Sequence, residues 1–231
     1  QSDLIYNEEL LVGKTALVTG GATGLGRAIA LGLSRVGAKV VIVSRQEEVL
    51  INAAKEISDE AGREVSYDVV DIRDVESVEQ LSHRHANIDI LVNNAGGQFP
   101  QKARDFTPNG WRSVIDLNLN GTWNMTQAFG NKMLEGAGGS ICQIIATVGR
   151  GIPGIAHSAS ARAGVLELSR TLAFEWGPKV RVNCVAPGQF RTDAFDSTYE
   201  DGVGDGFVEQ PLPDIGDVSD IANGVIFLVS P

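Results

Sequence analysis

The sequence of 231 residues contains little cysteine, few aromatic residues and fewer basic than acidic side chains. Its two cysteines, Cys142 and Cys184, lie in apolar runs, which favours small buried side chains over a disulfide or a metal site. The formal net charge is −10, from acids scattered along the chain, so nucleic acid and anionic membranes are not expected partners. A reducing compartment fits this composition.

Long apolar runs and a secretion signal are also missing. No run reaches the ~20 residues that cross a bilayer, and residues 1–11 lack the basic-then-apolar pattern of a leader. A hydrophobic content of 43% is ordinary for a globular protein, and the length suits one domain. We expect a soluble, cytoplasmic protein whose single domain spans residues 1–231.

Short apolar runs alternate with helical patterns. The expected strands are 15–18, 39–43, 65–70, 88–92, 140–145 and 180–185, and the expected helices are 25–36, 47–60, 75–82, 108–134, 156–177 and 221–229. This order predicts an α/β Rossmann fold, a doubly wound parallel sheet flanked by helices. One more strand would be expected after 229, so a C-terminal strand is predicted to be missing from the chain. The irregular stretch 190–215 is interpreted as a substrate loop.

A glycine-rich turn, Thr19-Gly-Gly-Ala-Thr-Gly-Leu-Gly26, follows the first expected strand. Gly20 suits the sharp reversal because glycine readily adopts positive φ angles. Gly24 lets the backbone approach a pyrophosphate, and Gly26 permits close contact between helix and sheet. The N-terminus of the next helix then offers free N–H groups to negative charge. The turn predicts the phosphate site of a dinucleotide.

The second expected strand ends in Ser44-Arg45, where an acidic residue would instead bind the ribose 2′-hydroxyl of NAD. A guanidinium can pair with a phosphate through two hydrogen bonds, and a serine hydroxyl can add a third. The pair therefore favours NADP(H) over NAD(H), and an ordinary solvated arginine is the alternative.

Three further motifs occur with the turn: Asn93-Asn-Ala-Gly96, Asn118-Leu-Asn-Gly121, and Pro187-Gly188 with Thr192. Together they resemble the short-chain dehydrogenase/reductase superfamily over nearly the whole chain. The resemblance implies that Asp71 and Ile72 contact adenine, that Asn118 holds a kinked helix, and that Thr192 faces the nicotinamide. The cofactor-binding residues that it implies are Thr19, Gly20, Thr23, Gly24, Leu25, Gly26, Ser44, Arg45, Asp71, Ile72, Asn93, Ala95, Gly96, Arg162, Pro187, Gly188 and Thr192.

The usual Tyr-x-x-x-Lys proton relay of that superfamily is replaced here by Ser158 and Arg162. An aliphatic hydroxyl is a much weaker acid than a phenol, and the very high pKa of arginine prevents it from transferring a proton. Upstream, Thr147 supplies the remaining hydroxyl. His157 is expected to face sideways and to pack. The candidate catalytic residues are Asn118, Thr147, Ser158 and Arg162.

These replacements are similar to those of peroxisomal trans-2-enoyl-CoA reductases and 2,4-dienoyl-CoA reductases. That resemblance implies reduction of a carbon–carbon double bond in an acyl thioester, in which the enolate oxygen needs only positioned donors. The partner it implies is a small-molecule substrate, an acyl-CoA. A homotetramer or dimer through residues 121–136 and 156–177 is also implied. Two alternatives stay open: an alcohol or carbonyl oxidoreductase acting on a lipophilic substrate with another proton donor, and a non-catalytic NADP(H)-binding protein.

Overall fold

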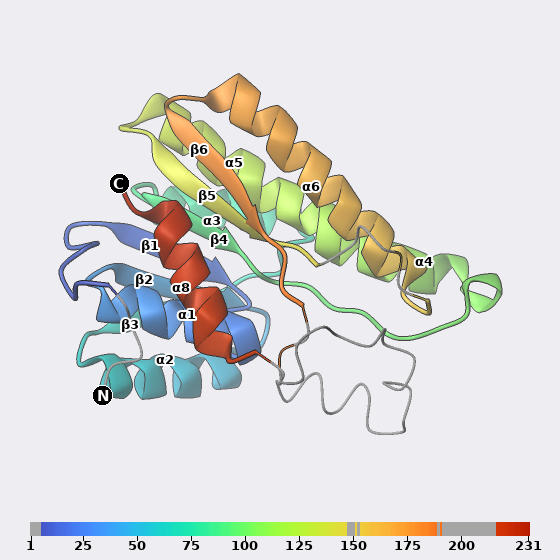
Figure 1. The fold of residues 1–231 in the computed structure, drawn as a ribbon, viewed down its shortest axis with the longest axis horizontal. Coiled ribbons are helices and arrows are strands. Elements are labelled where there is room, and N and C mark those ends of the chain that lie inside the picture. Colours follow the sequence, from blue (N-terminus) through green and yellow to red (C-terminus); the bar gives the residue numbers. More distant parts are fainter. Residues whose placement is uncertain (1–5, 147–150, 152, 189, 191–215) are drawn as a thin grey trace.

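The computed structural model describes residues 6–146, 151, 153–188, 190 and 216–231. Its centre is a sheet of six parallel strands in the order β3-β2-β1-β4-β5-β6 (Figure 1). The strands are β1 (Thr15–Thr19), β2 (Lys39–Ser44), β3 (Val65–Val69), β4 (Ile90–Asn93), β5 (Gly139–Ile144) and β6 (Val180–Val185). The strand order changes direction between β1 and β4, so the doubly wound fold is confirmed.

Helices cover both faces of the sheet. One hydrophobic core lies between the sheet and α1 (Gly24–Arg35), α2 (Glu47–Ala61) and α8 (Val218–Val229). A second core lies on the opposite face, under α3 (Val75–Arg84), α5 (Gly121–Glu135) and α6 (Ala156–Trp176). Figure 1 shows α1, α2 and α8 on one side and α5 and α6 on the other. These predicted elements are confirmed, with small shifts at their ends.

The central strands are apolar over most of their length because both faces are covered. Ile90, Leu91 and Val92 of β4, for example, are all buried. The edge strand β3 instead exposes Tyr67 and Val69. The carboxyl ends of the central strands therefore meet at one edge of a rigid, dry sheet, which is where a doubly wound fold binds its ligand.

Residues 108–135 are helical, as predicted for 108–134, but the helix is divided into three contiguous segments. The helix α4 (Pro108–Ile115) follows the short 3-10 turn η1 (Ala103–Asp105), and Thr107 caps it by accepting the N–H of Gly110 at 3.0 Å. A π-helical segment, η2 (Asp116–Asn120), then precedes α5. The wider turn of a π-helix inserts a residue without ending the apolar periodicity, so the pattern alone did not reveal it.

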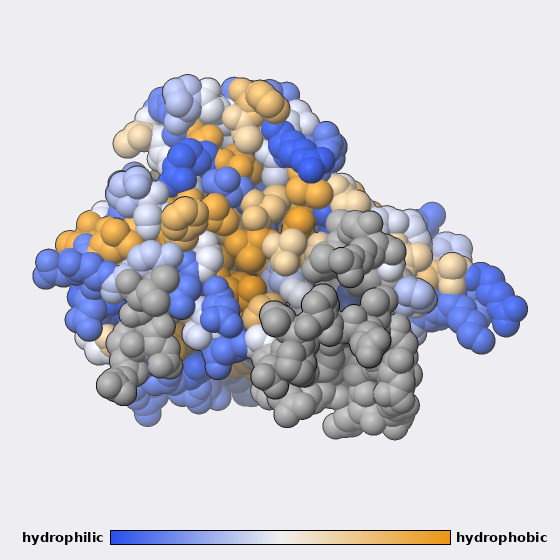
Figure 2. Space-filling model, viewed as in Figure 1, coloured by the Kyte–Doolittle hydropathy of each residue, from blue (hydrophilic) through white to orange (hydrophobic). Residues whose placement is uncertain are grey.

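The outer surface of α8 is apolar. Figure 2 shows hydrophobic residues gathered in the middle of this face, over α8 and the strands beside it, and Phe227 of α8 is 69% exposed. Despite this surface, no helix in the described ranges combines the length and the apolar character needed to cross a membrane.

Two isoleucines of α2 test the assignment of its buried face. Ile57 is fully buried, whereas Ile51 is 44% exposed. We expect Ile57→Ala to lower the free energy of unfolding by about 2–5 kcal/mol, because it removes apolar contacts and leaves a cavity. The matched change Ile51→Ala should stay within about 0.5 kcal/mol of the unchanged protein. Urea unfolding followed by circular dichroism measures both, and equal losses would contradict the assignment.

Candidate functional site

The glycine-rich turn lies at the carboxyl end of β1 and leads into α1. Gly20 and Gly24 have φ angles of +62° and +52°, the left-handed region that glycine accepts without strain. Thr23 is the N-cap of α1, but its side chain does not cap the helix, and no acidic residue lies in the first turn. The first N–H groups of α1 therefore keep their capacity to bind an anion.

Hydrogen bonds join this turn to the end of β4. The Thr19 hydroxyl accepts the N–H groups of Asn94 at 3.0 Å and Ala95 at 2.9 Å. The Asn94 amide donates to the carbonyls of Thr19 and Gly20, and a Cβ atom at Gly26 would overlap with the Gly20 carbonyl oxygen. The hydroxyl of Thr19, a predicted cofactor residue, is thus used within the fold. The role of Asn94 was missed, although it lies inside the Asn93–Gly96 motif.

The side chain of Asn93 faces the interior. It is 2% exposed, and its amide donates to the Thr126 hydroxyl at 2.9 Å, as does the amide of Gln143. Asn93 can therefore support a cofactor only from beneath. The backbone from Asn94 to Gly97 becomes progressively more exposed and borders the open side of the sheet.

Charged side chains gather after β2 and β3. Arg45 is exposed and makes no hydrogen bond or ion pair with another residue in the described part of the chain. Arg73 binds the Asp71 carboxylate through Nε at 2.9 Å and holds the pKa of that carboxyl below its usual range, with a smaller contribution from Arg45. Asp74 rather than Asp71 caps α3. Ile72 is buried beside this group.

The π-helical segment turns Asn118 toward the end of β4. Its Oδ1 atom accepts the N–H of Gly97 at 2.9 Å, and its Nδ2 atom donates to the Gly97 carbonyl at 3.0 Å. The same Nδ2 atom lies 3.4 Å from the hydroxyl oxygen of Ser158 on α6. Two of the predicted catalytic residues are therefore brought together, and Gly97 is an unpredicted partner of both backbone contacts.

Arg162 is a buried cation beside this pair. Its side chain is 8% exposed, its Nη1 atom donates to the Ile144 carbonyl at 2.7 Å, and a Cβ atom at Gly96 would overlap with the guanidinium. No carboxylate of the described residues lies within ion-pair distance of it. Burial lowers the pKa of Arg162 to about 10, so it stays protonated at neutral pH. Its remaining N–H groups suit an oxygen-rich or anionic ligand.

His157 is fully buried at the start of α6. Its Nδ1 atom accepts the N–H of Ser158 at 2.7 Å, and its ring packs against Phe99 and Phe106 with centroid distances of 4.7 and 4.4 Å. Burial lowers the pKa of His157, so the imidazole is neutral at neutral pH. The packing role expected for this residue is confirmed, and it fixes α6 against the segment that follows β4.

The remaining predicted residues lie around the same end of the sheet or outside the described ranges. Pro187 is buried and Gly188 is exposed just after β6, while Leu25 is half-buried in the first turn of α1. The predictions for Thr147 and Thr192 fall outside the described residues, as does the substrate loop proposed for 190–215 apart from Phe190. The helix α6 contains neither tyrosine nor lysine.

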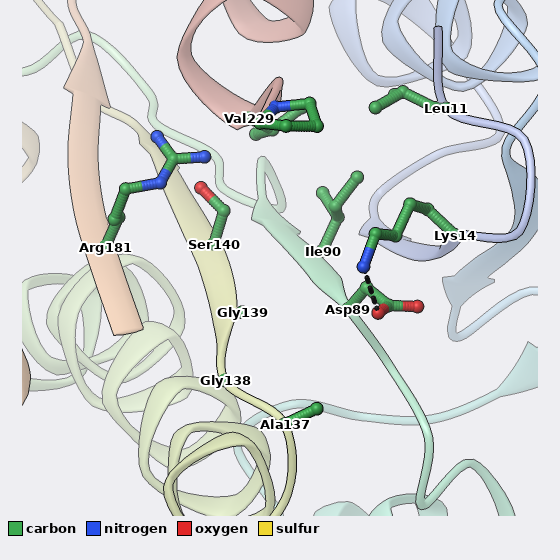
Figure 3. A pocket seen from close by; sticks show the side chains of 11 residues that line it. Leu11, Lys14, Asp89, Ile90, Ala137, Gly138, Gly139, Ser140, Arg181 and Val229 are labelled. Atoms are coloured by element: carbon green, nitrogen blue, oxygen red, sulfur yellow. Dashed lines mark hydrogen bonds and ion pairs between the residues drawn. The ribbon is translucent and has the colours of Figure 1, made fainter. Parts of the chain in front are cut away.

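A cavity of about 180 Å³ lies at the opposite end of the sheet, where the strands begin (Figure 3). Lys14 and Asp89 both line this cavity, and they form an ion pair in which Nζ of Lys14 lies 3.0 Å from Oδ1 of Asp89. Arg181 also lines it and donates to the carbonyls of Leu228 and Ser230. Because these charged groups are already paired, and because the glycine-rich turn lies at the other end, this cavity is not the candidate site.

Comparisons with known proteins agree with this geometry. Residues 14–202 match the family model described as short chain dehydrogenase. The chain is 37% identical to a 3-oxoacyl-[acyl-carrier-protein] reductase of Chlamydia muridarum, over 96% of this chain and 92% of the relative. It is 36% identical to a peroxisomal 2,4-dienoyl-CoA reductase of Danio rerio, over 98% and 78%.

Among solved structures, an actinorhodin polyketide ketoreductase variant with NADPH superposes with a TM-score of 0.87. Its sequence is 29% identical, and the match covers 94% of this chain and 90% of the other. The fold, the turn and the family match together lead to one conclusion. The chain belongs to the short-chain dehydrogenase/reductase family of oxidoreductases.

Proposed function

We propose that the chain is an NADP(H)-dependent reductase that saturates the carbon–carbon double bond of an enoyl thioester. The observation that carries the proposal is the buried group formed by Asn118, Ser158 and Arg162. These residues offer hydrogen-bond donors and a positive charge, but none of them is an acid that titrates near neutral pH. Such a group suits a substrate oxygen that becomes negative and stays unprotonated during the step.

The glycine-rich turn and the residues that follow β2 suit the binding of a dinucleotide coenzyme. The positive φ angles of Gly20 and Gly24 and the uncapped first turn of α1 suit a pyrophosphate. Arg45, which forms no ion pair with another described residue, and Ser44 would hold the 2′-phosphate. When bound, the nicotinamide supplies the hydride. We also propose that the Arg162 guanidinium donates hydrogen bonds to the ribose hydroxyl groups of the coenzyme.

The proposed reaction does not require a protein side chain to protonate the thioester oxygen. A hydride adds to the β-carbon of the substrate, the double-bond electrons move toward the thioester oxygen, and the α-carbon then takes a proton from water. Ser158 donates to that oxygen, Asn118 orients the Ser158 hydroxyl, and Arg162 adds its positive charge. Donors fixed before the reaction stabilise the developing charge more than mobile water does, because they need not reorganise.

Carbonyl reduction makes a stronger demand, because an alkoxide must receive a proton at oxygen. Ser158 is a weak acid. The ring of His157 is fully buried against two phenylalanine rings, and its Nε2 atom has no hydrogen-bond partner among the described residues that could deliver a proton to it. The similarity to a 3-oxoacyl-[acyl-carrier-protein] reductase nevertheless favours carbonyl reduction as the second candidate. A third candidate is a protein that binds NADP(H) without turnover.

The decisive experiment follows NADPH absorbance with a panel of substrates. Crotonyl-CoA and a longer 2-enoyl-CoA test the proposal, 3-oxoacyl thioesters and medium-chain ketones test the second candidate, and NADPH binding by calorimetry tests the third. We expect turnover with the enoyl thioesters and little with the carbonyl compounds. Turnover of the carbonyl compounds alone would replace the proposal, and tight NADPH binding without any turnover would favour a binding protein.

The 2′-phosphate assignment is tested by Arg45→Ala. Loss of a charge-assisted pair should raise the NADPH dissociation constant about 10- to 100-fold. The NADH constant should change by no more than about twofold, because NADH has no phosphate at that position. Both constants can be measured by fluorescence titration. Equal losses for the two coenzymes would remove Arg45 from the 2′-phosphate site.

Ser158→Ala tests the donor group. We expect kcat with an enoyl-CoA to fall about 100-fold, the effect of removing one donor to a developing oxyanion. The NADPH dissociation constant should stay nearly unchanged. Ser160 provides a matched control, since it lies on the same helix but is exposed. Ser160→Ala should retain full kcat, and an unchanged kcat in Ser158→Ala would contradict the proposed role of that hydroxyl.

A further inference from the structure

An ion pair after β3 stands next to the proposed 2′-phosphate site. Arg73 donates from Nε to both carboxylate oxygens of Asp71, at 2.9 and 3.1 Å, and its backbone N–H adds a bond of 3.0 Å. Asp71 also interacts electrostatically with Arg45, the residue that follows β2, yet the two form no ion pair. The Asp71 carboxylate is thus oriented toward Arg73, and the Arg45 guanidinium forms no ion pair within the described part of the chain.

The ion pair between Arg73 and Asp71 matters because carboxylates outnumber guanidinium groups around it. Three carboxylates interact electrostatically within the group, those of Asp71, Asp74 and Asp116, against two guanidinium groups, those of Arg45 and Arg73. The register of β2 and β3 pairs Ser44 with Val69, so Arg45 and Asp71 follow the same end of two neighbouring strands. A phosphate brought to Arg45 would be repelled by the Asp71 carboxylate, with which Arg45 interacts electrostatically. An acidic side chain at the edge of this site disfavours a 2′-phosphate, as the preference of acidic sites for NAD illustrates.

We propose that Arg73 is a positioning residue that sets the preference for NADP(H) by neutralising Asp71. It turns the carboxylate away from Arg45, so that Arg45 remains available to the phosphate and Asp71 no longer repels it. The inference rests on the proposed function, in which Arg45 binds the 2′-phosphate. It adds a residue that acts through Asp71 rather than through a contact with the coenzyme.

The experiment is a double-mutant cycle on coenzyme affinity. Dissociation constants for NADPH and NADH are measured by fluorescence titration for the unchanged protein, Arg73→Ala, Asp71→Asn and the double variant. Arg73→Ala should weaken NADPH about five- to tenfold and NADH by no more than about twofold, because only NADPH places a charge near Asp71. This loss should shrink at high ionic strength, since the site is solvent-exposed.

The second arm of the cycle identifies the mechanism. When Asp71 is already replaced by asparagine, removing Arg73 should change NADPH affinity by no more than about twofold, because no carboxylate is left to neutralise. Arg84→Ala is the matched control, since Arg84 binds Asp68 of β3 through two donors in the same exposed manner. It should leave both constants unchanged.

Three outcomes would overturn the inference. Equal losses for NADPH and NADH in Arg73→Ala would indicate a structural role. A loss specific to NADPH that persists in the Asp71→Asn background would show that Arg73 acts on the phosphate directly. An unchanged NADPH constant in Arg73→Ala, combined with a large loss in Arg45→Ala, would refute the inference while leaving the proposed function intact. If Arg45→Ala also has no effect, the 2′-phosphate site itself fails.

Discussion

The attachment of the first strand to the fourth is the constraint on which the rest of the structure depends. Thr19 and Asn94 exchange hydrogen bonds where the strand order reverses, and Gly26 lets α1 approach the same point. These contacts fix the glycine-rich turn relative to the backbone after β4. The glycine-rich turn, where we propose that the coenzyme phosphates bind, and the proposed reaction site are therefore held by the same rigid part of the fold. Hydride transfer requires the coenzyme and the substrate to be aligned in this way.

A buried positive charge gives the site its chemical character. Taking a guanidinium out of water costs free energy. No carboxylate among the described residues pairs with Arg162, and the carbonyl of Ile144 offsets only part of that cost. In the proposed reaction, a substrate oxygen that gains negative charge would offset the remainder of this cost. The lowered pKa of Arg162 reflects the same desolvation. Neutral His157 holds the nearby helix without adding a competing charge.

Much of this fold could be predicted from the sequence because its signals are local. Apolar runs marked the strands, and Gly20 and Gly24 occupy the positive φ angles that the turn requires. The hydrogen bonds of buried polar side chains were harder to predict. A strand covered on both faces does not reveal where a polar side chain points, so the hydrogen bonds that the Thr19 hydroxyl accepts from the backbone of Asn94 and Ala95 were not predicted. The ion pair of Arg73 escaped notice because an arginine in a polar stretch has no distinctive pattern.

The π-helical segment has a consequence for how this chain can vary. Each residue of a helix turns the next by about 100°, so one residue lost between Asp116 and Asn120 would rotate α5 relative to α4. Phe129 and Met133 of α5 would leave the core under α3, α5 and α6, and Asn118 would lose its hydrogen bonds to Gly97. Only Asn120 of this stretch is exposed, and a substitution there disturbs the fold less than a change in the length of the stretch. Related chains should therefore differ here in residue type and never by insertion or deletion.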